Sequence, residues 1–243
     1  MTMLHKTQLI VLHTIKYSDS SLLVYAYTQL FGRQTYLLKG IRTAKKHGLA
    51  AHFFPLHPLE AVVDHDPGRD IQYIKEFHRV VDLSLLRTQL HKSALALFIG
   101  ELLYKSLQEN APNPELYHFI KQAIFTLNTL ESGLPNFHLH FMVQLAIYSG
   151  YSPLQNYHPQ QAPYFDYSQG GFCAQPSLHS FPADESLLLH RLLSQPKDFA
   201  LWPLDQSVRN RFVADMARYL GYHMGVSLAL KSPEILHQVL SAF

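Results

Sequence analysis

The sequence of 243 residues contains a single cysteine, Cys173, and a single tryptophan. One cysteine allows no disulfide within the chain and excludes a zinc site built from four cysteines. Charged residues make up only 16% of the chain, whereas apolar residues make up 47%. This composition supplies a hydrophobic core and is not typical of a disordered protein.

Long apolar runs are missing as well. No stretch approaches the roughly 20 apolar residues that a membrane-spanning helix needs, so we expect no membrane association. The short apolar run at residues 9–12 is soon followed by His13 and Lys16, which is unlike the core of a secretory signal. We therefore expect the protein in the reducing cytoplasm.

Signatures of catalysis are scarce. The sequence has no G-x-S-x-G, no glycine-rich phosphate loop and no H-E-x-x-H. Among the sixteen histidines the closest pair is His138 and His140, and side chains two apart on a helix point in different directions. A lone cysteine is more often structural than catalytic. We expect no enzyme, no cofactor and no metal site; a metal-dependent enzyme built on the histidines is the weakest alternative.

Acidic residues are absent between Asp19 and Glu60. Residues 1–80 hold ten Lys and Arg against six Asp and Glu, a net charge of +4, whereas residues 81–243 hold ten against twelve, a net charge of −2. Within the acid-free stretch, "KGIRTAKKHG" at 39–48 carries four cations in eight residues. The positive field therefore belongs to the N-terminal part of the chain.

The N-terminal part, residues 1–81, is rich in β-branched and aromatic residues in short runs separated by turn formers. The predicted strands are "LIVLHTI", "LLVYAYTQLF", "RQTYLLKG", "PLEAVVD" and "DIQYIKEFHRVV". A short helix is possible in "HGLAAHFFP", between the third and fourth strands. Five short strands with a helix in that place follow the order of an OB-fold barrel, although another small barrel has the same pattern.

After Asp82 the apolar residues recur at helical spacing. We expect an α-helical bundle domain made of residues 82–150 and 184–243, with helices over 83–108, 114–132, 137–150, 184–194, 205–221 and near 232. Residues 151–183 are rich in Pro, Gly, Gln and Tyr and predict an irregular inserted module with a hairpin at 169–171. The predicted fold class is thus α+β and multidomain: an OB-fold barrel followed by an α-helical domain with an insertion.

A nucleic-acid interface is the function that the basic segment suggests. Strand alternation places Arg33 and Lys39 on one face of the third strand. Single-stranded DNA needs cations for its phosphates and aromatic rings for its bases, and the nearby tyrosines are Tyr25, Tyr27, Tyr36 and Tyr73. The predicted DNA-binding residues are Arg33, Tyr36, Lys39, Arg42, Lys45 and Lys46. The same cations could instead dock the acidic tail of a protein partner, which would make the chain an adaptor.

The order and spacing of several motifs resemble the RecO family of bacterial recombination mediators. The N-terminal match runs through "IVLHTIKYSDSSLLVYAYTQLFGRQTYLLKGIR", "FFPLHPLEAVV" and "IQYIKEF". "GYSP", "FDYSQGGF" and "RYLGYHMG…LKS" continue it to residue 232. The family pattern includes Val11-Leu12, Tyr17, Asp19, Thr28, Gly32 and Lys39-Gly40-Ile41-Arg42.

The resemblance implies a DNA repair and recombination mediator without enzymatic turnover. Such proteins bind single- and double-stranded DNA, anneal complementary strands, and act with RecR and single-stranded DNA-binding protein to load RecA, which implies a cytoplasmic, nucleoid-associated location. It also implies that Lys39 and Arg42 lie on the DNA-binding side of the barrel. Many members carry four zinc-binding cysteines in the inserted module; this chain keeps only Cys173, so that region is a degenerate zinc finger. Lys46-His47 stands where a Lys-Ser pair is common.

Overall fold

A computed structural model describes residues 3–41 and 49–241. Contacts group the chain into two compact units, of which the first comprises residues 1–89 and 96–128 and the second residues 90–95 and 129–243. Each unit has its own set of buried apolar side chains. No helix within the described ranges is both long and apolar enough to cross a membrane.

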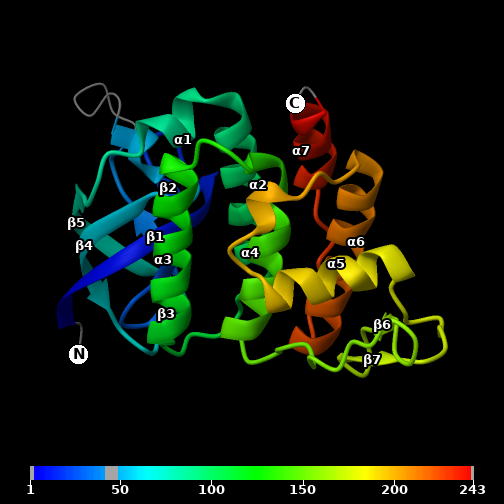
Figure 1. The fold of residues 1–243 in the computed structure, drawn as a ribbon. Helices are drawn as coiled ribbons and strands as arrows, with labels where there is room; N and C mark the ends of the chain where they lie inside the picture. Colours follow the sequence, from blue (N-terminus) through cyan, green and yellow to red (C-terminus); the bar gives the residue numbers. More distant parts are fainter. Residues whose placement is uncertain (1–2, 42–48, 242–243) are drawn as a thin grey trace. The chain divides into compact units, whose positions relative to one another are not determined.

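The first unit is built on a five-stranded barrel (Figure 1). Its strands are β1 (Met3–Lys16), β2 (Leu22–Thr28), β3 (Gly32–Leu38), β4 (Pro58–His65) and β5 (Gln72–Arg79). They follow the order β1-β2-β3-β5-β4, and β1 also pairs with β4, so the barrel closes. All neighbours are antiparallel except β3 and β5, which pair in parallel. This is the OB-fold order, and it confirms the predicted fold class.

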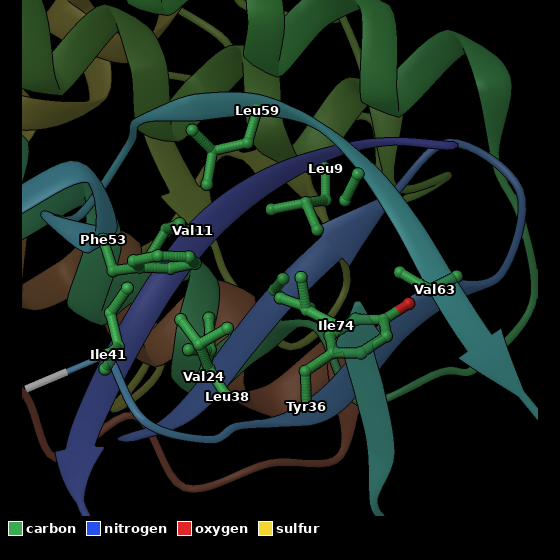
Figure 2. Packing of buried hydrophobic residues seen from close by; sticks show 12 residues of the cluster. Leu9, Val11, Val24, Tyr36, Leu38, Ile41, Phe53, Leu59, Val63 and Ile74 are labelled. Carbon is green, nitrogen blue, oxygen red and sulfur yellow. The ribbon is translucent and has the colours of Figure 1, made fainter. Parts of the chain in front are cut away.

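Side chains alternate between the inside and the outside of the closed barrel. Along β3, Gln34, Tyr36 and Leu38 are buried, whereas Arg33 is partly exposed. Figure 2 shows the resulting core, to which Phe53 is contributed by η2 (Leu49–Phe53), the helix expected between the third and fourth strands. The core consists of Leu9, Val11, Val24, Ala26, Tyr36, Leu38, Ile41, Phe53, Leu59, Ala61, Val63 and Ile74.

Three helices complete the first unit: α1 (Ser84–Thr88), α2 (Leu90–Ser106), whose first residues belong to the second unit, and α3 (Pro114–Thr129). The expectation of one helix over 83–108 was wrong, because Gln89 is extended and separates α1 from α2. The connection from α2 to α3 lies against the β2–β3 turn. A Cβ on Gly32 would lie 2.3 Å from the carbonyl oxygen of Ala111, and the φ of Gly32 is +61°, so glycine is required there.

The second unit contains α4 (Leu134–Tyr148), α5 (Ala183–Ser194), η3 (Phe199–Leu201), α6 (Gln206–Met224) and α7 (Ser232–Leu240). Between α4 and α5 lies the predicted hairpin, β6 (Tyr164–Asp166) with β7 (Gly171–Cys173). Helix α5 begins at Ala183, one residue earlier than the expected 184–194, so Asp184 lies in its first turn.

Asp166 organises the inserted module. Its carboxylate accepts hydrogen bonds from the hydroxyls of Ser168 (2.6 Å) and Ser177 (2.7 Å) and from the amides of Ser168 and Gln169. Burial alone would raise the pKa of Asp166, but these hydrogen bonds outweigh it and lower the pKa. Cys173 donates to the carbonyl of Tyr164. Within residues 3–41 and 49–241, no three His, Cys, Asp or Glu side chains gather as metal ligands do.

A buried carboxylate joins α5 to α6. The side chain of Glu185 is fully buried and accepts a hydrogen bond of 2.8 Å from Nε of Arg211, which also pairs with Asp184. Burial, together with the neighbouring Asp215, raises the pKa of Glu185 from 4.5 to about 7. The folded protein therefore holds a proton on Glu185 over a pH range in which the unfolded chain has already released it.

This proton links stability to pH. Because the folded chain binds more protons than the unfolded chain between pH 4.5 and about 7, Glu185 makes stability fall as pH rises through that window. Glu185→Gln should remove the decrease in stability that Glu185 causes as pH rises, so the variant should be more stable than the parent at pH 8. Denaturant unfolding at pH 5, 6, 7 and 8 measures it, and a variant that keeps the parent's slope would contradict the assignment.

Candidate nucleic-acid interface

Lys39 is exposed just after β3, where its ammonium group lies 5.1 Å from the ring centroid of Tyr73. The guanidinium carbon of Arg69 lies 5.5 Å from the same centroid, and Nζ of Lys75 lies 5.7 Å from it. Three cations therefore meet around one aromatic ring. We call Lys39, Arg69, Tyr73 and Lys75 the Tyr73 cluster.

The strand pairing explains why these residues meet. Leu37 of β3 pairs with Tyr73 of β5, and Lys39 follows two residues later on the same face. Lys75 follows Tyr73 by two residues and therefore also shares its face. A register shift between Val62 and Val63 marks a bulge opposite this part of β5, and such bulges re-aim side chains. Arg69 comes from the turn between β4 and β5.

Asp64 restrains two of the three cations. Its carboxylate accepts a hydrogen bond of 2.6 Å from Arg69 and lies 3.4 Å from Nζ of Lys75. The hydrogen bond from Arg69, supported by Lys75, holds the pKa of Asp64 below its ordinary value, so Asp64 is ionised at neutral pH. Lys39 forms no ion pair with any residue in the described ranges. Lys39 is thus the cation of the cluster that is available to an external anion.

Arg33 lies elsewhere and is engaged within the protein. Its guanidinium donates a hydrogen bond of 2.8 Å to the carbonyl of Leu107 and lies 4.8 Å from the ring centroid of Tyr104. Tyr25 flanks it at 5.5 Å. Burial lowers the pKa of Arg33, an effect that the neighbouring Tyr104 partly offsets. The structure therefore gives Arg33 a structural contact between β3 and the end of α2, whereas the sequence had predicted DNA binding.

Tyr36, which the sequence predicted to contact DNA, is not placed to stack on a base. Its side chain is fully buried, and Figure 2 shows the ring inside the barrel core. Alternation along β3 places it on the opposite face from Arg33. Tyr27 is also buried, with 3% of its surface exposed. Of the four tyrosines considered from the sequence, Tyr73 is the one around which several cations of the described residues lie.

The remaining predicted site residues, Arg42, Lys45 and Lys46, lie outside the described residues, as does the departure at His47. Arg69, Tyr73 and Lys75 were not among the predicted DNA-binding residues. A signal for them was present, because the turn Asp66-Pro67-Gly68-Arg69 ends just before the strand that carries Tyr73 and Lys75.

The fold and this cluster define a multidomain OB-fold protein with a basic, aromatic surface on its barrel. Family models agree with that description over almost the whole chain. Residues 1–80 match the model of the Recombination protein O N-terminal domain, and residues 87–229 match the model of the Recombination protein O C-terminal domain.

Curated proteins give the same result. The chain is 32% identical over 240 residues to the DNA repair protein RecO of Azobacteroides pseudotrichonymphae, covering 98% of this chain and 99% of that protein. It is 32% identical over 242 residues to the DNA repair protein RecO of Bacteroides fragilis, again covering 98% and 99%. The RecO protein of Christiangramia forsetii is 27% identical over 245 residues. The chain belongs to the RecO family of DNA repair proteins.

The burial of Tyr36 leads to a test. Its hydroxyl is buried and has no hydrogen-bond partner among the described residues, and an unpaired buried hydroxyl costs about 1–3 kcal/mol. Tyr36→Phe removes only that oxygen, so it should raise the free energy of unfolding by about 1 kcal/mol and leave oligonucleotide binding unchanged. Denaturant unfolding and fluorescence anisotropy measure the two quantities, and a destabilised variant would show that the hydroxyl is paired.

A second test separates the roles of Arg33 and Lys39. Arg33→Gln loses a charge-assisted hydrogen bond to Leu107 and should lower the free energy of unfolding by about 2 kcal/mol. The matched control Lys39→Ala, at an exposed position, should change it by less than about 0.5 kcal/mol. If urea unfolding shows that Lys39→Ala lowers the free energy of unfolding more than Arg33→Gln does, Lys39 and not Arg33 has the structural role.

Proposed function

We propose that this protein binds single- and double-stranded DNA through the Tyr73 cluster and anneals complementary strands. The observation that carries the proposal is the meeting of three cations around one partly exposed aromatic ring. Cations neutralise phosphates, and an aromatic ring offers a face to a base; the combination is typical of single-strand binding surfaces. Lys39 supports the proposal most strongly because it has no ion pair within the described ranges.

Arg42, Lys45 and Lys46 extend this proposed surface in the sequence, since they follow Lys39 within seven residues. With no acid between Asp19 and Glu60, their charges are uncompensated by sequence neighbours. A longer row of cations adds phosphate contacts, and each contact to a single strand steepens the salt dependence of binding by about 0.7 in the slope of log K against log salt.

Annealing follows from the same electrostatics. A cationic surface that contacts phosphates lowers the repulsion between two strands and leaves the Watson–Crick edges of the bases free to pair. No side chain needs to make or break a covalent bond, so the proposed activity is binding without turnover. In repair, we propose that the protein acts at the nucleoid with RecR and single-stranded DNA-binding protein to load RecA on protein-coated strands.

The double substitution Lys39→Ala and Lys75→Ala tests the proposal. It removes two of the three cations around Tyr73 and leaves Arg69 to pair with Asp64. Binding of a fluorescent oligothymidylate should weaken, and the slope of log K against log salt should flatten by about 1.4, which is two single-strand contacts. Annealing of complementary oligonucleotides should slow in parallel, with or without single-stranded DNA-binding protein.

The matched control is Lys6→Ala, which removes an exposed cation of the same barrel that pairs with Glu60. It should leave affinity and slope close to those of the parent. Unchanged binding by the folded double variant would overturn the proposal. An acidic peptide that binds with the same salt dependence, while DNA does not bind, would favour the adaptor function instead.

A further inference from the structure

A second feature of the first unit is a cavity of about 210 Å³ between the end of β5, η2 and α1. None of the described residues that line it belongs to the Tyr73 cluster. Its polar lining is dominated by two imidazoles and two guanidinium groups. The lining residues are His52, His57, Arg79, Val81, Asp82, Leu83, Ser84, Arg87 and Thr88. The volume is several times the roughly 30 Å³ that one water occupies in the liquid, so a hydrated phosphate group fits.

The charges of this cavity are unbalanced. Arg79 and Arg87 are exposed, and neither forms an ion pair with a residue in the described ranges. Asp82 is the one acid among the described lining residues, and its carboxylate already accepts the amide hydrogen of Ser84. Two cations therefore face one acid that already accepts a hydrogen bond from Ser84.

The histidines have hydrogen-bonding capacity to spare. His57 is 5% exposed, and its Nδ1 has no hydrogen-bond partner among the described residues; the same is true of Nδ1 of His52. A buried polar atom without a partner is costly, so both imidazoles leave hydrogen-bonding capacity unused beside the cavity. Burial, followed by the charges of Arg79 and Arg87, lowers the pKa of His52, and burial also lowers the pKa of His57. An anion in the cavity would reverse part of this shift by favouring the charged imidazoles.

This lining is poorly suited to a metal ion. Two guanidinium charges repel a cation, whereas their paired N–H donors match the oxygens of a phosphate. The hydroxyl of Ser84 adds a further polar group to the lining. The set of donors therefore indicates an anion with several oxygens.

A second hollow shares residues with both the cavity and the Tyr73 cluster. This hollow is lined by Lys75, which belongs to the cluster, and by His52 and Arg79, which belong to the cavity. Its other lining residues are Leu49, Glu76, Phe77 and His78. Cationic and imidazole groups thus follow β5 from Tyr73 to α1. A nucleic-acid strand that contacts Lys39 and Tyr73 and continues along β5 would bring a phosphate to the cavity.

We propose that His52, His57, Arg79 and Arg87 form a phosphate-binding pocket that holds a phosphate group of the DNA strand bound at the Tyr73 cluster. The proposal rests on the proposed function, because the strand supplies the phosphate. The pocket contributes two guanidinium contacts and two imidazole hydrogen bonds. It thereby extends the single-strand track beyond the basic segment and fixes the path of the strand along β5.

The test uses the full chain with Arg79→Gln and Arg87→Gln combined, both at exposed positions where the fold tolerates substitution. Anisotropy titrations with oligothymidylate bearing a 5′-hydroxyl or a 5′-phosphate should show weaker binding and a salt slope flatter by about 1.4. The control Arg191→Gln with Lys197→Gln removes the same charge from exposed positions of the second unit and should leave the slope unchanged.

Titration of the parent with inorganic phosphate, followed through the histidine ring signals by nuclear magnetic resonance, is the second readout. His52 and His57 signals should shift, and the shift should be lost in the arginine double variant. A defect seen with both oligonucleotides assigns the pocket to an internal phosphate, and a defect seen only with the 5′-phosphate assigns it to the strand end.

An unchanged slope in the arginine double variant overturns the inference, even if the histidine signals respond to inorganic phosphate. If the parent fails to bind either oligonucleotide, the proposed function fails instead. In that case a histidine shift on phosphate titration would leave a pocket for free phosphate alone, which contradicts the assignment to DNA.

Discussion

The parallel pairing of β3 with β5 is the interaction on which the candidate site depends. Two residue pairs make it, Tyr36 with Gln72 and Leu37 with Tyr73. Inside the barrel, this pairing joins β3 and β5 around the buried side chain of Tyr36. On the outer surface, it brings Lys39 beside Tyr73 and Lys75. Core and surface are therefore set by the same register, since a shift by one residue would exchange the inward and outward side chains of β3.

Like charges meet in the Tyr73 cluster, and the structure offsets their repulsion in two ways. The ring face of Tyr73 attracts cations, and such contacts stabilise by about 0.5–1 kcal/mol at exposed sites. Asp64 neutralises part of the charge of Arg69 and Lys75. Because Lys39 is left without an ion pair in the described ranges, the cluster keeps a net attraction for anions. A bound phosphate would offset the repulsion between these cations by forming favourable contacts with them.

Much of the fold could be predicted from the sequence, because strand alternation and turn residues are local signals. The five strands, η2 and the β6–β7 hairpin were all expected. The site was harder to predict, because it depends on pairing between strands that are far apart in the sequence. Arg33 and Lys39 share a face of β3, yet Arg33 contacts the end of α2, which no local pattern reveals. The parallel neighbour of β3 likewise brings Tyr73 to the cations, whereas Tyr36 is turned inward by alternation along β3.

We propose that a DNA strand crosses the barrel surface at Tyr73. Photocrosslinking with a single-stranded oligonucleotide that carries 5-iodouracil, followed by peptide mass spectrometry, tests this most directly, because the method marks the aromatic side chain in contact with a base. We predict a crosslink at Tyr73 that high salt and the substitution Lys39→Ala both reduce. Crosslinks confined to the second unit, with none on β5, would contradict it.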